Sequence, residues 1–169
     1  FADRDFREIA IAEFYYFTGR AQKCSNLVEI YIMSSRLELK LSACMLYVYS
    51  NLTLGNAKAS ERGLEIIREC LRKEMEAPTS ERNTAYCVFA GYMGTVLLHL
   101  STEELPDMKK YMSSLPQGLR IFAANVISHD LYLKGEYSRA LGICDAALFS
   151  CKEIYPVGMI YLYCVTAMC

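Results

Sequence analysis

The two histidines are the side chains of this 169-residue sequence that most resemble catalytic groups. His129 directly precedes Asp130, so on a helix the two side chains point about 100° apart and cannot form a simple acid–base dyad. His99 stands between leucines, a position typical of a histidine at a helix end. Because no Ser-His-Asp arrangement, carboxylate pair or glycine-rich phosphate loop accompanies them, we expect no catalytic residue and no enzyme activity.

The eight cysteines could form disulfides, bind a metal or act as nucleophiles. They are scattered through apolar segments, without a Cys-x-x-Cys pair and without a histidine at metal-ligand spacing. Cys24 and Cys151 adjoin basic residues, which favours a reactive thiolate, but we interpret both as packed side chains. We therefore predict free thiols, no metal, no cofactor and a reducing, cytoplasmic location. The cysteines are Cys24, Cys44, Cys70, Cys87, Cys144, Cys151, Cys164 and Cys169.

A binding surface is the better candidate for function. Three glycines, Gly19, Gly55 and Gly135, each follow an apolar helical segment, and positions three, four and three residues apart before each glycine share one helix face. These positions are Phe6, Ile9, Glu13 and Tyr16, then Ser42, Met45, Tyr49 and Leu52, and finally Phe122, Asn125, His129 and Tyr132. Aromatic side chains with a few polar tips suit a protein or a small-molecule effector.

From these positions we predict a groove that binds an effector or partner. Its predicted lining residues are Phe6, Glu13, Tyr16, Met45, Tyr49, Asn125, His129 and Tyr132. For any single one of them, packing against a neighbouring helix is the alternative interpretation.

The elements that would hold this groove are helical hairpins, and the clearest one spans Leu131 to Ala147. Gly135 reverses the chain, and small or apolar residues then recur at steps of three, four and three along the second helix. They are Tyr137, Ala140, Cys144 and Ala147. This pattern resembles a tetratricopeptide hairpin, which cannot bury its apolar face alone and therefore repeats.

Two further hairpins precede it. The first joins helices predicted at Asp5 to Thr18 and Arg20 to Ile32, and the second ends its first helix at Gly55 and continues from Ala57 to Glu76. The last of these helices is heavily charged and carries one apolar stripe. The stripe consists of Leu64, Ile67, Leu71 and Met75.

The third hairpin starts near Glu81, and its turn lacks a glycine. Ser101 with Glu104 resembles a capping box, so we predict a short helix from Ser101 to Ser114 with Pro106 near its start. A fifth hairpin begins at Pro156 and is cut off at Cys169. The glycine spacings of 36 and 80 residues correspond to repeats of about 40, longer than the tetratricopeptide length of about 34.

The whole chain is therefore predicted to be one all-α domain, residues 1–169, with about nine helices in antiparallel pairs that form a tetratricopeptide-like superhelix. It has about four hairpins and a truncated fifth. Because it begins with Phe and ends inside an apolar segment, we expect it to be a fragment of a longer protein. The truncated end would expose an apolar helix face, so self-association through it is a further prediction.

Charge and hydropathy limit the partners. The net charge is −1, with 18 basic and 19 acidic residues, so no basic surface is predicted and we expect no nucleic acid contact by this segment. Leu41 to Ala57, Ala85 to Leu98 and Ile154 to Cys169 contain no charged residue. Each is shorter than the ~20 apolar residues of a membrane span and carries several hydroxyls, so we interpret them as inner helices and expect no membrane contact.

Several segments together resemble the helical-repeat region of large bacterial transcriptional regulators, the LuxR-type group with a MalT-like repeat domain. They are AEFYYFTGRAQKCSNLVE, LSACMLYVYSNLTLG, and LYLKGEYSRALGICDAAL followed by GMIYLYCVTAMC. In that group a nucleotide-binding module precedes the repeats and a helix-turn-helix follows them. This chain has neither the phosphate loop nor a basic recognition helix, so the resemblance implies neither ATP nor DNA binding here.

Two functions are compatible with the sequence. One is a regulatory sensor and interaction module of a LuxR-type regulator that binds an effector or a protein in its concave groove. The other is a stand-alone adaptor that scaffolds other proteins. The Lys and Asn clamp that some tetratricopeptide domains use for a peptide carboxylate is missing, because Ile9 and Glu13 occupy the corresponding places. Partners of that kind are therefore disfavoured.

Overall fold

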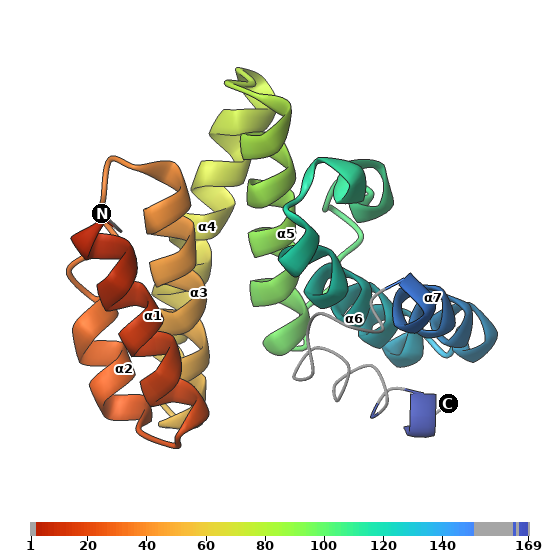
Figure 1. The fold of residues 1–169 in the computed structure, drawn as a ribbon, viewed down its shortest axis with the longest axis horizontal. Helices are drawn as coiled ribbons and strands as arrows, with labels where there is room; N and C mark the ends of the chain where they lie inside the picture. Colours follow the sequence, from red (N-terminus) through yellow and green to blue (C-terminus); the bar gives the residue numbers. More distant parts are fainter. Residues whose placement is uncertain (1–2, 151–163, 165, 169) are drawn as a thin grey trace.

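The computed structural model describes residues 3–150, 164 and 166–168, and over these residues the chain is helical without a strand (Figure 1). The elements are α1 (Arg4–Phe17), α2 (Ala21–Val28), α3 (Leu37–Thr53), α4 (Ala57–Glu76), α5 (Glu81–Leu97), the 3-10 helix η1 (Met108–Ser114), α6 (Gln117–Leu133) and α7 (Tyr137–Ser150). The prediction of an all-helical chain in packed pairs is confirmed for this part. None of the described helices is long and apolar enough to cross a membrane.

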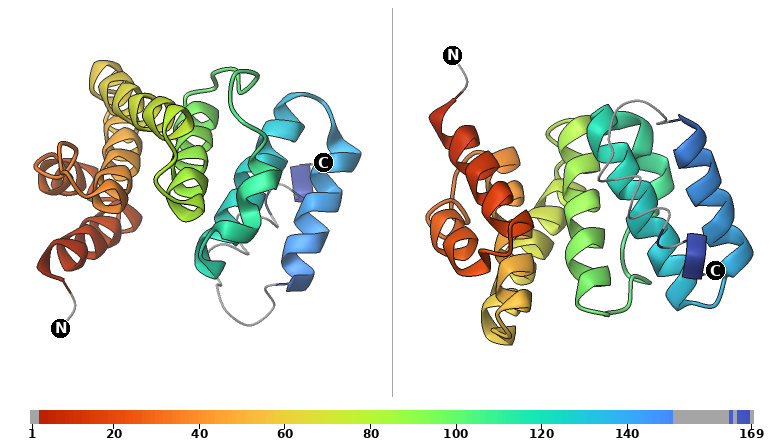
Figure 2. Two further views of the ribbon diagram at one scale, coloured as in Figure 1. Left: turned by 90° about the horizontal axis from the view of Figure 1, so that it is seen from above. Right: turned by 60° about the horizontal axis from the view of Figure 1, so that its bottom comes forward.

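The helices pack in pairs that follow the order of the chain. α1 contacts α2, α3 contacts α4, α5 contacts η1, and α6 contacts α7. The first members of the pairs also contact one another, α1 with α3, α3 with α5 and α5 with α6, so they follow one another across the molecule (Figure 2). The uncharged segments around α3 and α5 are the most deeply buried, as expected for helices covered on two sides.

The four first helices end in the same way. The chain takes a positive φ just beyond each helix, 74° at Gly19, 71° at Gly55, 75° at Gly135 and 53° at His99. The Gly19 amide donates to the carbonyl of Tyr16 (3.0 Å), and the next amide, of Arg20, donates to the carbonyl of Tyr15 (2.8 Å). The other three turns repeat this pair of bonds, which satisfies the last carbonyls of each helix.

The third turn therefore exists, with His99 in the place of the glycine. The amides of His99 and Leu100 donate to the carbonyls of Val96 and Thr95, both at 3.0 Å. The turns at 19, 55, 99 and 135 are separated by 36, 44 and 36 residues. The 80-residue interval was predicted to contain two repeats of about 40 residues. The structure divides it unequally, with the longer repeat between Gly55 and His99.

The prediction of a helix from Ser101 to Ser114 is wrong. The Ser101 hydroxyl accepts a hydrogen bond from the amide of Glu103 (3.3 Å), but residues 101–107 form turns and loop, and η1 begins only at Met108. Pro106 explains the difference, because a proline disfavours the helical conformation in the residue before it and lacks an amide hydrogen. The carboxylate of Asp107 accepts from the amide of Lys109 (3.1 Å) and so begins η1.

The apolar stripe of α4 is confirmed at three positions and wrong at the fourth. Leu64, Ile67 and Leu71 are buried, whereas Met75 is 42% exposed and its neighbour Glu74 is only 4% exposed. The helix ends at Glu76 and the chain then turns back towards α5. The connecting residues therefore cover Glu74 and leave Met75 exposed.

The carboxylate of Glu74 joins α4 to α5. It accepts hydrogen bonds from the amide of Thr79 (2.8 Å), the hydroxyl of Thr79 (2.9 Å) and the hydroxyl of Thr84 (3.2 Å). Burial opposes ionisation of this carboxyl, but the bonds from Thr79, Ser80 and Thr84 outweigh it, so the pKa of Glu74 is lowered. A buried acid thus replaces an apolar contact at this joint.

Two other predictions concern the two ends of the chain. α2 ends at Val28 rather than Ile32, although Ile32 is buried beyond it in a turn. The predicted fifth hairpin lies outside the described residues except for residues 164 and 166–168, and so does most of the segment predicted to self-associate.

Candidate functional site

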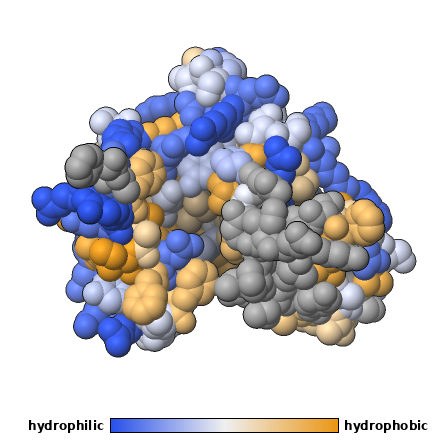
Figure 3. All heavy atoms as spheres, in the orientation of Figure 1, coloured by the Kyte–Doolittle hydropathy of each residue, from blue (hydrophilic) through white to orange (hydrophobic). Residues whose placement is uncertain are grey.

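A cavity of about 510 Å³ lies between the four first helices. In Figure 3 the surface is hollowed near the centre of the view, between the side chains of α1 and those of α5. The lining residues come from α1, α3, α5 and α6 and from two residues near the C-terminal end. They are Ile9, Glu13, Tyr16, Phe17, Ser42, Met45, Leu46, Tyr49, Tyr86, Phe89, Met93, Val96, Leu97, Leu119, Phe122, Asn125, Val126, His129, Cys164 and Met168.

Most of the predicted groove residues meet around this cavity. Of the eight, the six that line it are Glu13, Tyr16, Met45, Tyr49, Asn125 and His129. Ile9, Ser42 and Phe122, selected by the same spacing, line it as well. Equivalent positions on successive helices therefore converge on one space.

Two predicted residues lie outside the cavity. Phe6 packs under the guanidinium of Arg36, whose central carbon lies 5.0 Å from the ring centroid. Tyr132 packs against Tyr137, with the ring centroids 5.4 Å apart. Phe6 stands in the first turn of α1 and Tyr132 in the last turn of α6, where adjoining connections and the next helix offer nearer partners. The assignment of these two residues to the groove is corrected.

The lining residues of α5 were not predicted from the sequence. Tyr86, Phe89, Met93 and Val96 precede His99 by 13, 10, 6 and 3 residues, the offsets found before each turn glycine, and all four line the cavity. Because residue 99 is not a glycine, the sequence did not mark the turn from which the lining positions of this helix could be counted. The 36-residue interval from His99 to Gly135, equal to that from Gly19 to Gly55, was the signal that could have located them.

Aromatic rings form much of the cavity wall. The rings of Tyr16 and Tyr49 lie 5.9 Å apart across α1 and α3, and those of Tyr86 and Phe89 lie 6.3 Å apart on α5. The hydroxyls of Ser42 and Tyr86 are hydrogen-bonded at 2.7 Å and so connect α3 to α5. Burial raises the pKa of Tyr86 against the lowering effect of the Ser42 hydrogen bond, and the charges of Glu38 and Glu13 add to the rise.

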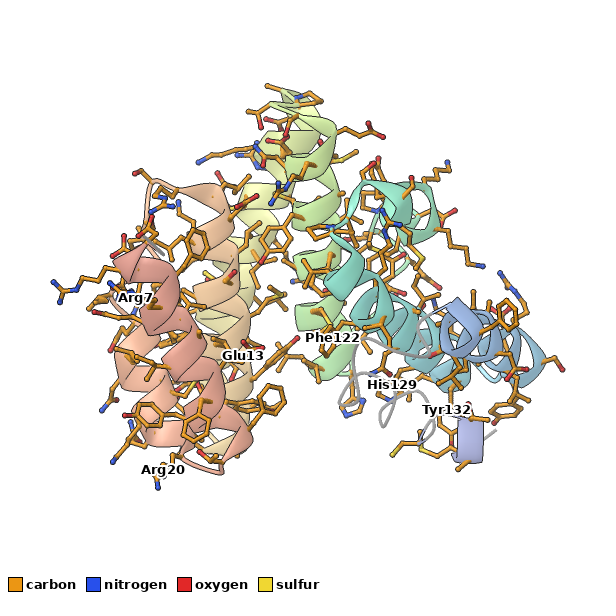
Figure 4. The ribbon with its side chains drawn as sticks, viewed as in Figure 1. Arg7, Glu13, Arg20, Phe122, His129 and Tyr132 are labelled. Carbon is orange, nitrogen blue, oxygen red and sulfur yellow. The ribbon has the colours of Figure 1, made fainter. Side chains whose placement is uncertain are left out.

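Two titratable groups lie on opposite sides of the cavity. Glu13 projects from α1 towards the side that carries Phe122 and His129 (Figure 4). Glu13 is an exposed residue, but the side chains around its carboxylate partly desolvate it and so raise the pKa of Glu13. Burial lowers the pKa of His129, with a further contribution from the charge of His99, while Asp130 opposes the change. The described lining thus places a carboxyl group on one wall, with its pKa raised, and an imidazole on the other, with its pKa lowered.

The described cysteines lie apart from this site, except for Cys164. Cys24, Cys44 and Cys87 are buried, and burial raises the pKa of their thiols to about 11, 12 and 12. Cys24 is thus a protonated core side chain despite its basic neighbours in sequence. Cys70, Cys144 and Cys164 are also free thiols. Cys151 and Cys169 lie outside the described residues.

Within the described part of the chain, no group of three or more His, Cys, Asp or Glu side chains could hold a metal ion. Comparison with known proteins adds no assignment, because no family model, no curated protein and no solved structure matches this chain.

Proposed function

We propose that this chain is a ligand-binding module built as a tetratricopeptide-like α-α superhelix, with the cavity on its concave side. The observation that carries the proposal is the convergence of equivalent positions from the first helices of four successive pairs on one space of about 510 Å³. Cavities of this size, with mostly apolar walls and a few polar groups, are typical of small-molecule sites.

A cavity-filling substitution tests this proposal. Met93→Trp places a larger side chain on the α5 wall, and Met75→Trp on the exposed face of α4 is the matched control. Nile red, an uncharged dye that fluoresces in apolar surroundings, serves as the probe. We expect Met93→Trp to weaken its binding about tenfold, since displacing two methylene-sized contacts costs about 1.6 kcal/mol.

The control should bind the dye like the unaltered chain, and the thermal unfolding of both variants confirms that they are folded. Equal binding by Met93→Trp and the unaltered chain would show that the dye does not enter this cavity, and no measurable binding to any of them would contradict a ligand-binding module.

For the longer protein, we propose that effector binding here regulates an attached output domain, as the resemblance to the repeat region of LuxR-type regulators suggests. Such a regulator would act in the cytoplasm, and DNA contact would belong to a separate domain. Each first helix contacts the next, so a ligand held between them can favour one arrangement of the pairs over another. A helix-turn-helix in the flanking reading frame would support this role.

A stand-alone adaptor is the second candidate, and one observation favours it. Phe14, Ile30 and Met33 lie outside the cavity, and each is more than half exposed. Exposed apolar side chains of this kind are found in protein contacts. A complete reading frame that ends near residue 169 without an output domain would favour the adaptor over the regulator.

A further inference from the structure

Among the described residues that line the cavity, Glu13 is the one carboxylate. The described lining residues include no Lys or Arg, and burial lowers the pKa of their histidine, His129. Within the described residues no side chain forms an ion pair or a hydrogen bond with the Glu13 carboxylate. Glu38, the other carboxylate whose charge acts on Tyr86, is paired with Arg82 at 2.9 Å. Among the described residues, Glu13 thus differs from Glu38 in having no cationic partner.

Aromatic rings stand beside this carboxylate. Tyr16 follows Glu13 by three residues on the same face of α1, and its ring packs against that of Tyr49. The charge of Glu13 also contributes to the raised pKa of Tyr86, which places α5 within its electrostatic reach. The faces of aromatic rings attract cations, and a carboxylate does so more strongly. One end of the cavity is therefore suited to a positively charged group.

The rest of the cavity is suited to an apolar chain. Beyond the polar groups, its walls are built from aliphatic and thioether side chains of α3, α5 and α6. These include Met45, Leu46, Met93, Val96, Leu97 and Val126. An anionic ligand would meet Glu13 with no basic residue among the described lining side chains to offset it, whereas a cationic ligand would offer this carboxylate a partner.

We propose that the cavity selects an amphiphilic organic cation, with its ammonium group against Glu13 and the neighbouring rings and its hydrocarbon part along the apolar walls. This inference rests on the proposed function and specifies the ligand class of that same site. Figure 4 shows the arrangement that it requires, with Glu13 in the space between α1 and α5 and Arg20 beyond the end of α1, away from that space.

Three probes with one hydrocarbon chain and different head groups test the proposal. They are n-octylammonium, 1-octanol and octanoate, each titrated calorimetrically at pH 7 and below micelle-forming concentrations. Glu13→Gln removes the charge with little change of shape, and Glu61→Gln on the exposed face of α4 is the charge-matched control. We expect octylammonium to bind the unaltered chain about ten- to a hundredfold more tightly than it binds Glu13→Gln, the range of a charge-assisted hydrogen bond.

Octanol should bind the unaltered chain and Glu13→Gln equally. Of the three probes, octanoate should have the lowest affinity for the unaltered chain. Glu61→Gln should bind each probe with the affinity of the unaltered chain. Equal octylammonium affinities for the unaltered chain and Glu13→Gln, with octanol bound normally, would overturn the charge selection and leave the ligand-binding proposal standing. Absence of binding by all three probes, together with absence of Nile red binding, would overturn both.

Discussion

The second and third hairpins share a turn and differ in their second elements. After Gly55 the chain forms α4, a helix of 20 residues that packs against both α3 and α5. After His99 it forms a loop and then η1, a 3-10 helix of 7 residues. The first helices of the two hairpins, α3 and α5, nevertheless have 17 residues each, and both present to the cavity the side chains thirteen, ten and six residues before the turn.

This contrast indicates that the turn, rather than the second helix, sets the register of the inner helix. The turn bonds fix where the helix ends, and the side chains three, six, ten and thirteen residues earlier then share one face. The second element needs only to cover the outer side of α5. A short 3-10 helix can do this where the loop is held by other means.

Side-chain hydrogen bonds hold that loop in place of a helix. The Thr102 hydroxyl and the Lys134 ammonium each bond to the carboxylate of Asp130 on α6 at 2.8 Å, and the ammonium bonds to Thr102 as well. The guanidinium of Arg120 donates to the carbonyls of Leu115 (2.9 Å) and Ser113 (2.6 Å) at the end of η1. In the third hairpin, side-chain hydrogen bonds from α6 and its C-terminal end therefore hold the loop and the end of η1.

The largest expected effect comes from breaking the joint between the two hairpins at Glu74. Glu74→Ala removes the acceptor of the Thr79 amide and one of the two acceptors of the Thr84 hydroxyl, the other being the carbonyl of Ser80, so we expect a loss of about 1–3 kcal/mol in the free energy of unfolding. Urea denaturation at pH 7 measures it. Met75→Ala, one residue along on the exposed face, is the control and should change stability by less than about 0.5 kcal/mol.

The same carboxylate gives a pH dependence of known sign. The folded-state pKa of Glu74 is lowered, so its contribution is complete above the unfolded pKa of about 4.3 and is lost as the pH falls through the lower folded value. The stability difference between the unaltered chain and Glu74→Ala should therefore be constant from about pH 7 to about pH 5 and shrink below that range. A difference that grows on acidification would contradict the assignment.

A smaller effect compares the two turns directly. No atom lies within 4 Å of a Cβ added at Gly55, so Gly55→Ala tests the backbone alone, and we expect it to destabilise the chain by about 1 kcal/mol because of its positive φ. His99→Gly relieves the same strain and should stabilise the chain by about 0.5 kcal/mol, the remainder after the greater entropy of glycine in the unfolded state. Urea denaturation measures both. If His99→Gly also destabilises the chain, the two turns are not equivalent.

Much of the fold depends on local patterns in the sequence. Gly19, Gly55 and Gly135 mark turns because glycine adopts a positive φ without strain, and the uncharged segments mark helices covered on two sides. α4 was predicted with its observed bounds, Ala57 to Glu76, since the turn before it and Pro78 after it delimit the helix. These features depend on residues close to one another in the chain.

The remainder depends on contacts between distant residues. A histidine can take the left-handed conformation at position 99, but nothing in its neighbours distinguishes it from an ordinary helix end. Met75 continues the apolar spacing of α4, yet the chain reversal buries Glu74, whose hydrogen-bond donors lie up to ten residues away. Phe6 and Tyr132 have the spacing predicted for groove residues, but their side chains pack against Arg36 and Tyr137 instead.

The smallest effect links the third turn to the cavity. Burial lowers the pKa of His129 first, and the charge of His99 lowers it further, so His99→Gly should raise the pKa of His129 while leaving it below the ordinary value of about 6.5. The chain has two histidines, so the variant leaves a single imidazole to follow by proton NMR as the pH is changed. Glu61→Gln, on the outer face of α4, should leave that titration where it is. If His129 titrates at the same pH with and without His99, the turn does not act on the cavity, and the two hairpins differ only in how they are covered.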